Sequence, residues 1–186
     1  MRLPRNVWVS LSGWFLLSAG LMAAPGAAGQ APAPSQPSAN RGGQVIPVTA
    51  VDIRRLVREA GAGVVVVNLW ATWCKPCVEE FPDLLRLRRE FQDRGLALLL
   101  VSADFDSELP QVAAFLERQG VDFPTYFKSE KDQEFINGLS AEWSGALPAT
   151  FVYDREGKLR HFWQGQTGYV MLEQRVREIL GIKSRG

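Results

Sequence analysis

The sequence predicts an α/β fold in which a central sheet is covered by helices on both faces. Two runs, residues 64–70 and 96–102, are almost wholly apolar, which is typical of strands buried on both faces. Segments with the periodicity of amphipathic helices alternate with these runs and favour a layered arrangement. The only two cysteines, Cys74 and Cys77, directly follow the first run, at a strand-to-helix junction typical of redox-active pairs.

Residues 1–28 have the anatomy of a secretory signal peptide or an N-terminal membrane anchor. Arg2 and Arg5 form a basic head, and residues 7–24 form an uncharged, mostly apolar run with small residues after it. The run approaches the roughly 18 residues at which a helix becomes long enough to span a bilayer, so cleavage and retention both stay open. In either case we expect the remainder to be exported, to the periplasm or another extracytoplasmic space.

Residues 29–44 are rich in Ala, Pro, Gly, Ser and Gln and predict a flexible linker. The domain proper is expected over 45–186, and 46% hydrophobic residues in the chain suffice for one buried core. All 20 acidic residues lie in this domain, and the formal net charge of the chain is +1, which argues against nucleic acid as a partner. Two cysteines are too few for a framework of structural disulfides.

The first half of the domain is built around the cysteines. Thr49 is expected to cap a helix that ends at Ala60, before the glycines at 61 and 63. The strand over 64–70 follows, and after the cysteines a helix is expected to reach Arg94, with a kink at Pro82.

The second half begins with the strand over 96–102. The elements expected after it are a helix over 108–119, a strand over 123–127, a helix over 131–139, a hairpin of strands 150–153 and 159–163 around the turn 155–157, and a closing amphipathic helix over 169–180.

Four roles are open for the cysteine pair. A structural disulfide that closes so short a loop contributes only on the order of 2 kcal/mol, a weak reason to place both cysteines together. Zinc requires four ligands, and His161 is the only further soft ligand, so we expect no metal or other cofactor. A copper–thiolate carrier is the strongest non-enzymatic alternative. Thiol–disulfide exchange fits best, because it needs only two sulfurs and a way to activate one of them.

The two cysteines occupy different positions along the helix, and we expect them to have different roles. Cys74 is expected at the helix N-terminus, where free N–H groups and the helix dipole stabilise a thiolate. Lys75 adds a nearby positive charge or is merely a solvated side chain, and Pro76 fits the first turn, where its missing N–H costs nothing. Cys77, one turn further in, is expected to be buried. We therefore predict Cys74 as the attacking nucleophile and Cys77 as the resolving thiol.

Two motifs resemble thioredoxin-fold proteins of the TlpA/ResA type, which are exported, often membrane-tethered thiol–disulfide oxidoreductases. The first is Val-Asn-Leu-Trp-Ala-Thr-Trp-Cys-Lys-Pro-Cys at 67–77, followed by Glu-Glu-Phe-Pro at 79–82. The second is Gly-Ala-Leu-Pro-Ala-Thr-Phe-Val at 145–152, followed by Asp154 and Gly157. The two motifs occur in the order that the family has, about seventy residues apart in this chain.

The resemblance covers nearly all of 45–180 and implies a thioredoxin-like fold: a central mixed sheet flanked by helices, with an extra strand and helix at 123–139. It implies that Pro148 follows a cis peptide bond and lies against the cysteines. Leu147 would then offer its backbone to an extended client segment. Trp73 would shield the sulfurs and add apolar contact surface.

Ordinary thioredoxins have a strand similar to 64–70, but they carry a buried Asp at the position of Asn68. That Asp moves protons for the inner cysteine. Asparagine cannot titrate, and exported relatives commonly have it there. A proton relay through Glu79 or Glu80 is one reading, although we expect this pair to form a solvated helix face. Trp70 is expected in the core, and His161 on the surface of the far hairpin.

The function implied by the resemblance is that of an exported protein-disulfide reductase. Its clients would be proteins with disulfides or paired cysteines, such as apocytochrome c during cytochrome c maturation, or a metallochaperone. Because an oxidising compartment keeps such a pair closed, a membrane thiol–disulfide electron donor is expected to recharge it. The alternative function is a copper–thiolate carrier or a redox-silent client-binding module.

Overall fold

The computed structural model describes residues 43–183. The strands are β1 (Val45–Val48), β2 (Val64–Trp70), β3 (Leu96–Ser102), β4 (Thr125–Lys128), β5 (Ala149–Asp154) and β6 (Leu159–Gln164). The α-helices are α1 (Ala50–Glu59), α2 (Lys75–Phe91), α3 (Leu109–Arg118), α4 (Asp132–Leu139) and α5 (Tyr169–Leu180), with short 3₁₀ helices η1 (Gln92–Arg94) and η2 (Asp106–Glu108). The signal peptide or anchor expected over 1–28, and all but the last two residues of the expected linker, lie outside the described residues. Within 43–183, no helix has the length and apolar character needed to cross a membrane.

The six strands form one mixed sheet in the order β1-β4-β3-β2-β5-β6. The pairs β2–β3, β3–β4 and β1–β4 are parallel, whereas β5 runs antiparallel to both β2 and β6. The α/β fold with a central mixed sheet is therefore confirmed. In this register Asn68 lies opposite Thr150, and Trp70 lies opposite Ser102. Polar residues of three strands thus meet near the carboxyl end of β2.

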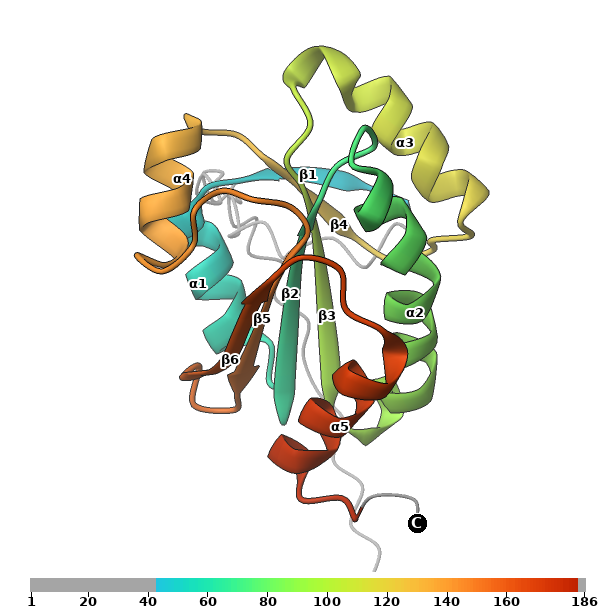
Figure 1. The fold of residues 1–186 in the computed structure, drawn as a ribbon, viewed down its shortest axis with the longest axis vertical. Helices are drawn as coiled ribbons and strands as arrows, with labels where there is room; N and C mark the ends of the chain where they lie inside the picture. The colour runs from blue at the N-terminus through green and yellow to red at the C-terminus, as the bar shows by residue number, and fades with distance from the viewer. Residues whose placement is uncertain (1–42, 184–186) are drawn as a thin grey trace, which may run out of the picture. The chain divides into compact units, whose positions relative to one another are not determined.

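Helices cover both faces of the sheet, with α1 and α4 on one side and α2 and α5 on the other (Figure 1). The central strand β2 is buried along its whole length, and its alternate side chains point to opposite faces. Val66 and Trp70 enter a core shared with α2, α3 and α5, whereas Val67 and Leu69 enter a core shared with α1 and α4. The strand that leads to the cysteines is therefore fixed from both sides.

The helices on either side of β2 begin where the sequence predicts. Thr49 and Asp52 form a capping box at α1: the Asp52 N–H donates to Thr49 Oγ1 at 3.2 Å, and the Thr49 N–H donates to the Asp52 carboxylate at 3.0 Å. At α2, Cys74 is the N-cap residue. This helix continues through Pro82, and the kink expected there stays a prediction.

The other expected elements are present within two residues of their predicted ends, and α5 agrees at both ends. Strand β1 was not predicted. Its run of four residues carries Pro47, which weakens the sequence signal for a strand. In the structure β1 lies at the edge of the sheet and pairs only with β4, where a missing N–H is tolerated. The predicted insertion, β4 and α4, therefore supplies the partner that holds β1.

Candidate active site

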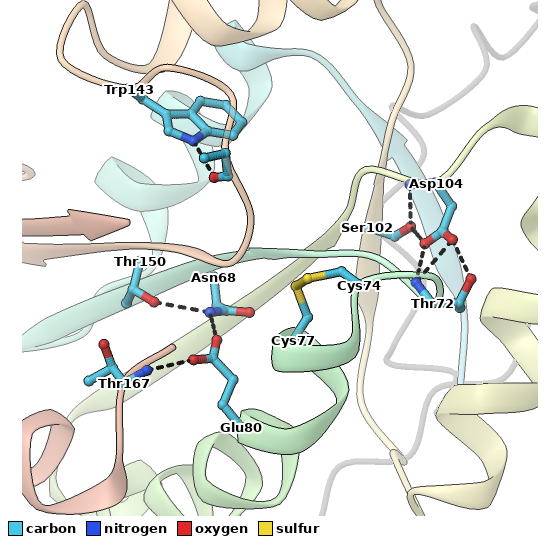
Figure 2. Close-up of a disulfide and its surroundings, with 11 residues drawn as sticks. Asn68, Thr72, Cys74, Cys77, Glu80, Ser102, Asp104, Trp143, Thr150 and Thr167 are labelled. Atoms are coloured by element: carbon cyan, nitrogen blue, oxygen red, sulfur yellow. Dashed lines mark hydrogen bonds between the residues drawn. A yellow bond between two sulfur atoms is a disulfide. The ribbon is translucent and has the colours of Figure 1, made fainter. Parts of the chain in front are cut away.

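The two cysteines form a disulfide at the N-terminus of α2 (Figure 2). Cys74 is the N-cap residue and Cys77 lies in the first turn, with the two Cα atoms 5.3 Å apart. Cys77 is completely buried, whereas Cys74 retains 6% of its surface exposed. Since only Cys74 retains any exposed surface, we expect an incoming disulfide to approach Cys74 rather than Cys77.

The start of α2 is prepared for a thiolate by its backbone. The Cys74 side chain makes no capping hydrogen bond in the disulfide form, and Pro76 in the first turn has no N–H to leave unpaired. An N-cap side chain accepts from the N–H three residues on, which here belongs to Cys77. When the disulfide opens, the Cys74 sulfur can therefore take that hydrogen bond, and the helix dipole stabilises its negative charge.

Lys75 contributes less than its charge suggests. Its ammonium group forms an ion pair with Glu79, and the Lys75 side chain is 85% exposed. Exposed pairs of this kind are worth roughly 0–1 kcal/mol, because water screens both charges. The Glu79 carboxylate also offsets much of the positive charge that Lys75 could offer to Cys74. Activation at this site therefore rests mainly on the helix N-terminus.

Glu79 and Glu80 have opposite environments, so the solvated face expected for the pair is wrong for Glu80 and correct for Glu79. Successive residues on a helix point about 100° apart. Glu79 faces solvent, whereas Glu80 is only 2% exposed. The Asn68 Nδ2 group donates to Glu80 Oε1 at 2.8 Å, and the Thr167 N–H donates to Oε2 at 2.9 Å. Glu80 is thus a buried, hydrogen-bonded carboxyl group one turn beyond Cys77.

Asn68 stands between this carboxyl group and the sulfurs. Its Nδ2 group also donates to Thr150 Oγ1 at 3.0 Å, so both amide protons are used. Its Oδ1 atom is buried, has no hydrogen-bond partner among the described residues, and points toward the disulfide in Figure 2. Burial raises the pKa of Glu80, although the hydrogen bonds from Thr167 and Asn68 oppose this shift. The site therefore holds an acceptor aimed at the cysteines and, behind it, a carboxyl group that ionises at higher pH than usual.

A second buried carboxylate, Asp104, was missed by the sequence reasoning. The Thr72 N–H donates to its two oxygens at 3.0 and 3.1 Å, the Thr72 hydroxyl donates to Oδ1, and the Ser102 hydroxyl donates to Oδ2 at 2.6 Å (Figure 2). These bonds tie the loop before Cys74 to the end of β3. A signal existed: Asp104 follows the apolar strand at its carboxyl end, beside the strand that leads to the cysteines.

Replacing Asp104 with alanine should lower the free energy of unfolding by about 1–3 kcal/mol, because the buried donors of Thr72 and Ser102 lose their acceptor. Chemical denaturation followed by far-ultraviolet circular dichroism measures the change. Asp106→Ala, at an exposed position two residues on, is the matched control and should stay within about 0.5 kcal/mol of the wild type. Equal effects of the two substitutions would show that the Asp104 network does not hold this loop.

The second sequence motif forms the opposite wall of the site. The Leu147–Pro148 peptide bond is cis, Pro148 is buried, and Ala149 pairs with Leu69 of β2, so this segment lies beside the loop that leads to Cys74. The Pro148 carbonyl accepts from the Gly165 N–H at 2.8 Å. In contrast, within residues 43–183 no hydrogen bond reaches the N–H or C=O group of Leu147. This short backbone edge is free to pair with another chain.

Trp73, Trp70 and His161 differ in how far they are exposed to solvent. Trp73 is 58% exposed beside Cys74, whereas Trp70 is buried in the core as predicted. His161 is half-buried rather than on the surface, with Nε2 3.7 Å from Glu178 Oε2. Burial and the nearby Arg175 lower the pKa of His161, while Glu178 opposes this shift.

Residues 43–162 match the model of the AhpC/TSA family. The chain belongs to this family. Over 125 residues it is 34% identical to thiol-disulfide oxidoreductase ResA of Geobacillus thermodenitrificans, with 67% of each chain covered. It is 28% identical to thioredoxin-like protein YneN of Bacillus subtilis, covering 64% of this chain and 67% of that protein. The chain thus spans about two thirds of the length of these curated relatives.

Solved structures agree with this assignment. A thiol:disulfide interchange protein of the thioredoxin family from Chlorobium tepidum superposes with a TM-score of 0.56 at 25% identity, covering 65% of this chain and 82% of that one. The resemblance to TlpA/ResA-type proteins, the thioredoxin-like fold and the enzyme class predicted from the sequence are confirmed. This AhpC/TSA family member is a thiol–disulfide oxidoreductase with a Cys74–Cys77 pair.

Proposed function

We propose that this family member works outside the cytoplasm as a reductase of client disulfides, with Cys74 as nucleophile and Cys77 as resolving thiol. The observation that carries the proposal is the asymmetric burial of the two cysteines: Cys74 keeps 6% of its surface exposed at a helix N-terminus, and Cys77 is completely enclosed next to the Asn68–Glu80 pair. Export is supported by the basic head and apolar run of residues 1–28. An uncleaved run would tether the domain through residues 29–44.

In the first step the Cys74 thiolate attacks one sulfur of the client disulfide. A bond forms between Cys74 Sγ and that sulfur, the client S–S bond breaks, and the second client sulfur leaves as a thiolate. The hydrogen bond available from the Cys77 N–H favours the attacking thiolate, since it stabilises the negative charge at the helix N-terminus. Lys75 and Pro76 shape this first turn of α2.

In the second step Cys77 loses its proton and attacks Cys74 Sγ. The mixed disulfide breaks, the reduced client leaves, and Cys74 and Cys77 close into the disulfide present in the structure. Glu80 is the proposed proton acceptor, because its raised pKa is closer to the working pH than that of an ordinary carboxylate. Asn68 Oδ1 orients the Cys77 thiol, and Asn68 Nδ2 holds Glu80. Exposed Glu79 forms an ion pair with Lys75 and has no part in this relay.

The client docks along the backbone of Leu147. Its N–H and C=O groups, which have no partner among residues 43–183, suit the addition of an extended client segment, with buried Pro148 next in the chain and exposed Trp73 lining the same pocket as Leu147. Clients of the proposed reductase are exported proteins with disulfides or paired cysteines, such as apocytochrome c or a metallochaperone. Each turnover gives two electrons to the client, so a membrane thiol–disulfide donor must reopen the pair.

The Cys77→Ser variant should accumulate a mixed disulfide with its client, because the resolving thiol is gone. The chain is expressed with its N-terminal segment, and acid quench stops thiol exchange by protonating free thiolates. Species joined to Cys74 are then released by reduction and identified by mass spectrometry. Cys74→Ser is the control and should trap nothing, since Cys77 is enclosed. A client protein joined to Cys74 through one of its own cysteines would support reduction of that client.

A copper–thiolate carrier or redox-silent module would give a different result. The reduced wild type would bind one copper ion tightly and leave insulin disulfides intact. The Cys77→Ser variant would trap no protein. That combination would contradict the proposed reductase.

A further inference from the structure

A small apolar pocket lies beside the cysteine pair, between the loop before α2 and helix α4. Its volume is about 220 Å³. Trp73 and Leu147 form its wall on the side of the active site, Phe105 lies in the loop after β3, and Phe135, Ile136 and Trp143 form the far wall. Trp73 and Phe105 are 58% and 63% exposed, so the pocket opens to solvent next to Cys74. Neither disulfide exchange nor the proposed proton relay uses this space.

The far wall of the pocket is held in place by its own contacts. The Trp143 Nε1–H group donates to the Ala146 carbonyl at 2.9 Å, and the Trp143 ring meets Phe135 and Phe151 edge to face with centroids 6.2 and 5.9 Å apart. Gly145 has a φ of +89°, and a Cβ atom there would lie 2.6 Å from Ile136 Cδ1. A glycine at this position thus lets helix α4 come close. The wall is preformed, which reduces the entropy lost when a ligand enters.

The lining determines which chemistry the pocket accepts. Its two charged residues, Lys128 and Asp132, form an ion pair at 2.6 Å, and Lys128 also donates to the Glu130 carbonyl at 3.2 Å. An entering charge would therefore lose its water and gain no free partner. The volume exceeds the roughly 150 Å³ of an apolar cavity that holds one benzene molecule. The pocket suits one uncharged aromatic or large aliphatic side chain.

We propose that this pocket is a specificity subsite, which receives one aromatic or large aliphatic side chain of the client beside its reacting cysteine. The occupant is a client segment because the pocket is continuous with Leu147, whose side chain lines it and whose backbone groups are unpaired among residues 43–183. One bound strand can thus pair with Leu147, present its sulfur to Cys74 and place a neighbouring side chain in the pocket. This inference rests on the proposed function for the identity of the partner.

The test uses short peptides, each with one cysteine carried as a mixed disulfide with thionitrobenzoate. Phe, Leu, Ser or Asp is placed in turn at the two positions on either side of that cysteine. The reduced protein is mixed with each peptide, and release of the yellow thiol gives the rate of attack by Cys74. At one position we expect Phe and Leu to react at least about tenfold faster than Ser, and Asp to react most slowly.

Two substitutions should remove this preference. Ala103→Leu adds volume inside the pocket, and Phe105→Ser removes an exposed wall without disturbing the core. In both variants the Phe-to-Ser rate ratio should fall toward one. Ala113→Leu, the same change on the exposed face of α3, is the matched control and should keep the ratio of the wild type. Equal rates for Phe and Ser peptides in the wild type, or an unchanged ratio in both pocket variants, would overturn the subsite.

A second measurement separates the subsite from the enzyme reaction. The oxidised protein is titrated with the Phe and Ser peptides in which the cysteine is replaced by alanine, and the indole N–H signals of Trp73 and Trp143 are followed by NMR. Shifts with the Phe peptide alone would support the subsite even if no peptide exchanged its disulfide, in which case only the proposed reductase would fail. Indole signals that stay unchanged with both peptides would count against the subsite independently of any redox step.

Discussion

The Glu80→Gln variant should release reduced client about 10²-fold to 10⁴-fold more slowly than the wild type, which is the usual contribution of a positioned general base. Glutamine keeps the shape of Glu80 and a hydrogen bond to Asn68 or Thr167, but it cannot accept a proton from Cys77. Attack by Cys74 does not need this group, so the mixed disulfide should form at a normal rate and then persist. Rapid mixing with a peptide disulfide, acid quench and mass spectrometry measure both steps.

A structural role for Glu80 would not produce the pH profile that a proton acceptor gives. In the wild type, resolution should slow as the pH falls through the raised pKa of Glu80. In Glu80→Gln, the defect should shrink as the pH rises toward about 8.5, where an ordinary thiol ionises unaided. Glu79→Gln, at the exposed neighbouring position, is the matched control and should behave as wild type. Equal pH profiles for Glu80→Gln and Glu79→Gln would rule out the relay.

Stability should depend on pH through the same carboxyl group. Because burial raises the pKa of Glu80 in the folded chain, protonation favours the folded state. This contribution is fully present below the ordinary value of 4.5 and is lost as the pH rises from there through the raised pKa. The free energy of unfolding of the wild type, relative to Glu80→Gln, should therefore fall over this interval. A constant difference would mean that Glu80 has the same pKa in both states.

Replacing Phe81 with alanine should lower the free energy of unfolding by about 3–5 kcal/mol. Phe81 is completely buried on α2, and its ring packs against Trp70 and Phe115 with centroids 4.9 Å away in both cases. The substitution leaves a cavity in the core that joins β2, α2 and α3. Denaturant unfolding measures the loss, and Val51→Ala, at a position 62% exposed on α1, should change stability by less than about 0.5 kcal/mol.

The same substitution should also affect the active site, because Phe81 anchors the helix whose first turn holds both cysteines. We expect dithiols to reduce the Cys74–Cys77 pair of Phe81→Ala at a rate that rises more steeply with denaturant concentration than the rate for the wild type.

A loss of less than about 1 kcal/mol in the free energy of unfolding of Phe81→Ala would mean that the core around Trp70 collapses to fill the space.

Much of the fold could be predicted from the sequence because its signals are local. Strand β2 has a run rich in β-branched apolar residues and helix α5 has an amphipathic pattern, and the predicted bounds of both agree with the structure. The N-cap at Thr49 is a property of a few neighbouring residues, and the position of Cys74 at the start of α2 follows from the strand before it. The two motifs also indicated the active-site wall at Leu147 and Pro148.

The parts that could not be predicted depend on residues far apart in the chain. Glu79 and Glu80 are the same residue type, and the carboxyl group of Glu80 is held in the core by Asn68 and Thr167, 12 and 87 positions away, which both donate to it. Asp104 acquires its role from the register between β2 and β3, which places it beside Thr72. β1 is a strand only because β4 lies beside it. In each case the partner, not the local pattern, determines the structure.

The backbone groups of Leu147, which have no partner within residues 43–183, limit which segments can dock beside Cys74. An edge of one residue pairs only with a segment that is already extended and has no partner of its own. A disulfide inside a finished domain lies on backbone whose hydrogen bonds are already taken, and such a segment would have to unfold first. We therefore expect the geometry beside Cys74 to discriminate by conformational state: unfolded chains and unstructured tails would reach it, whereas folded proteins would keep their disulfides.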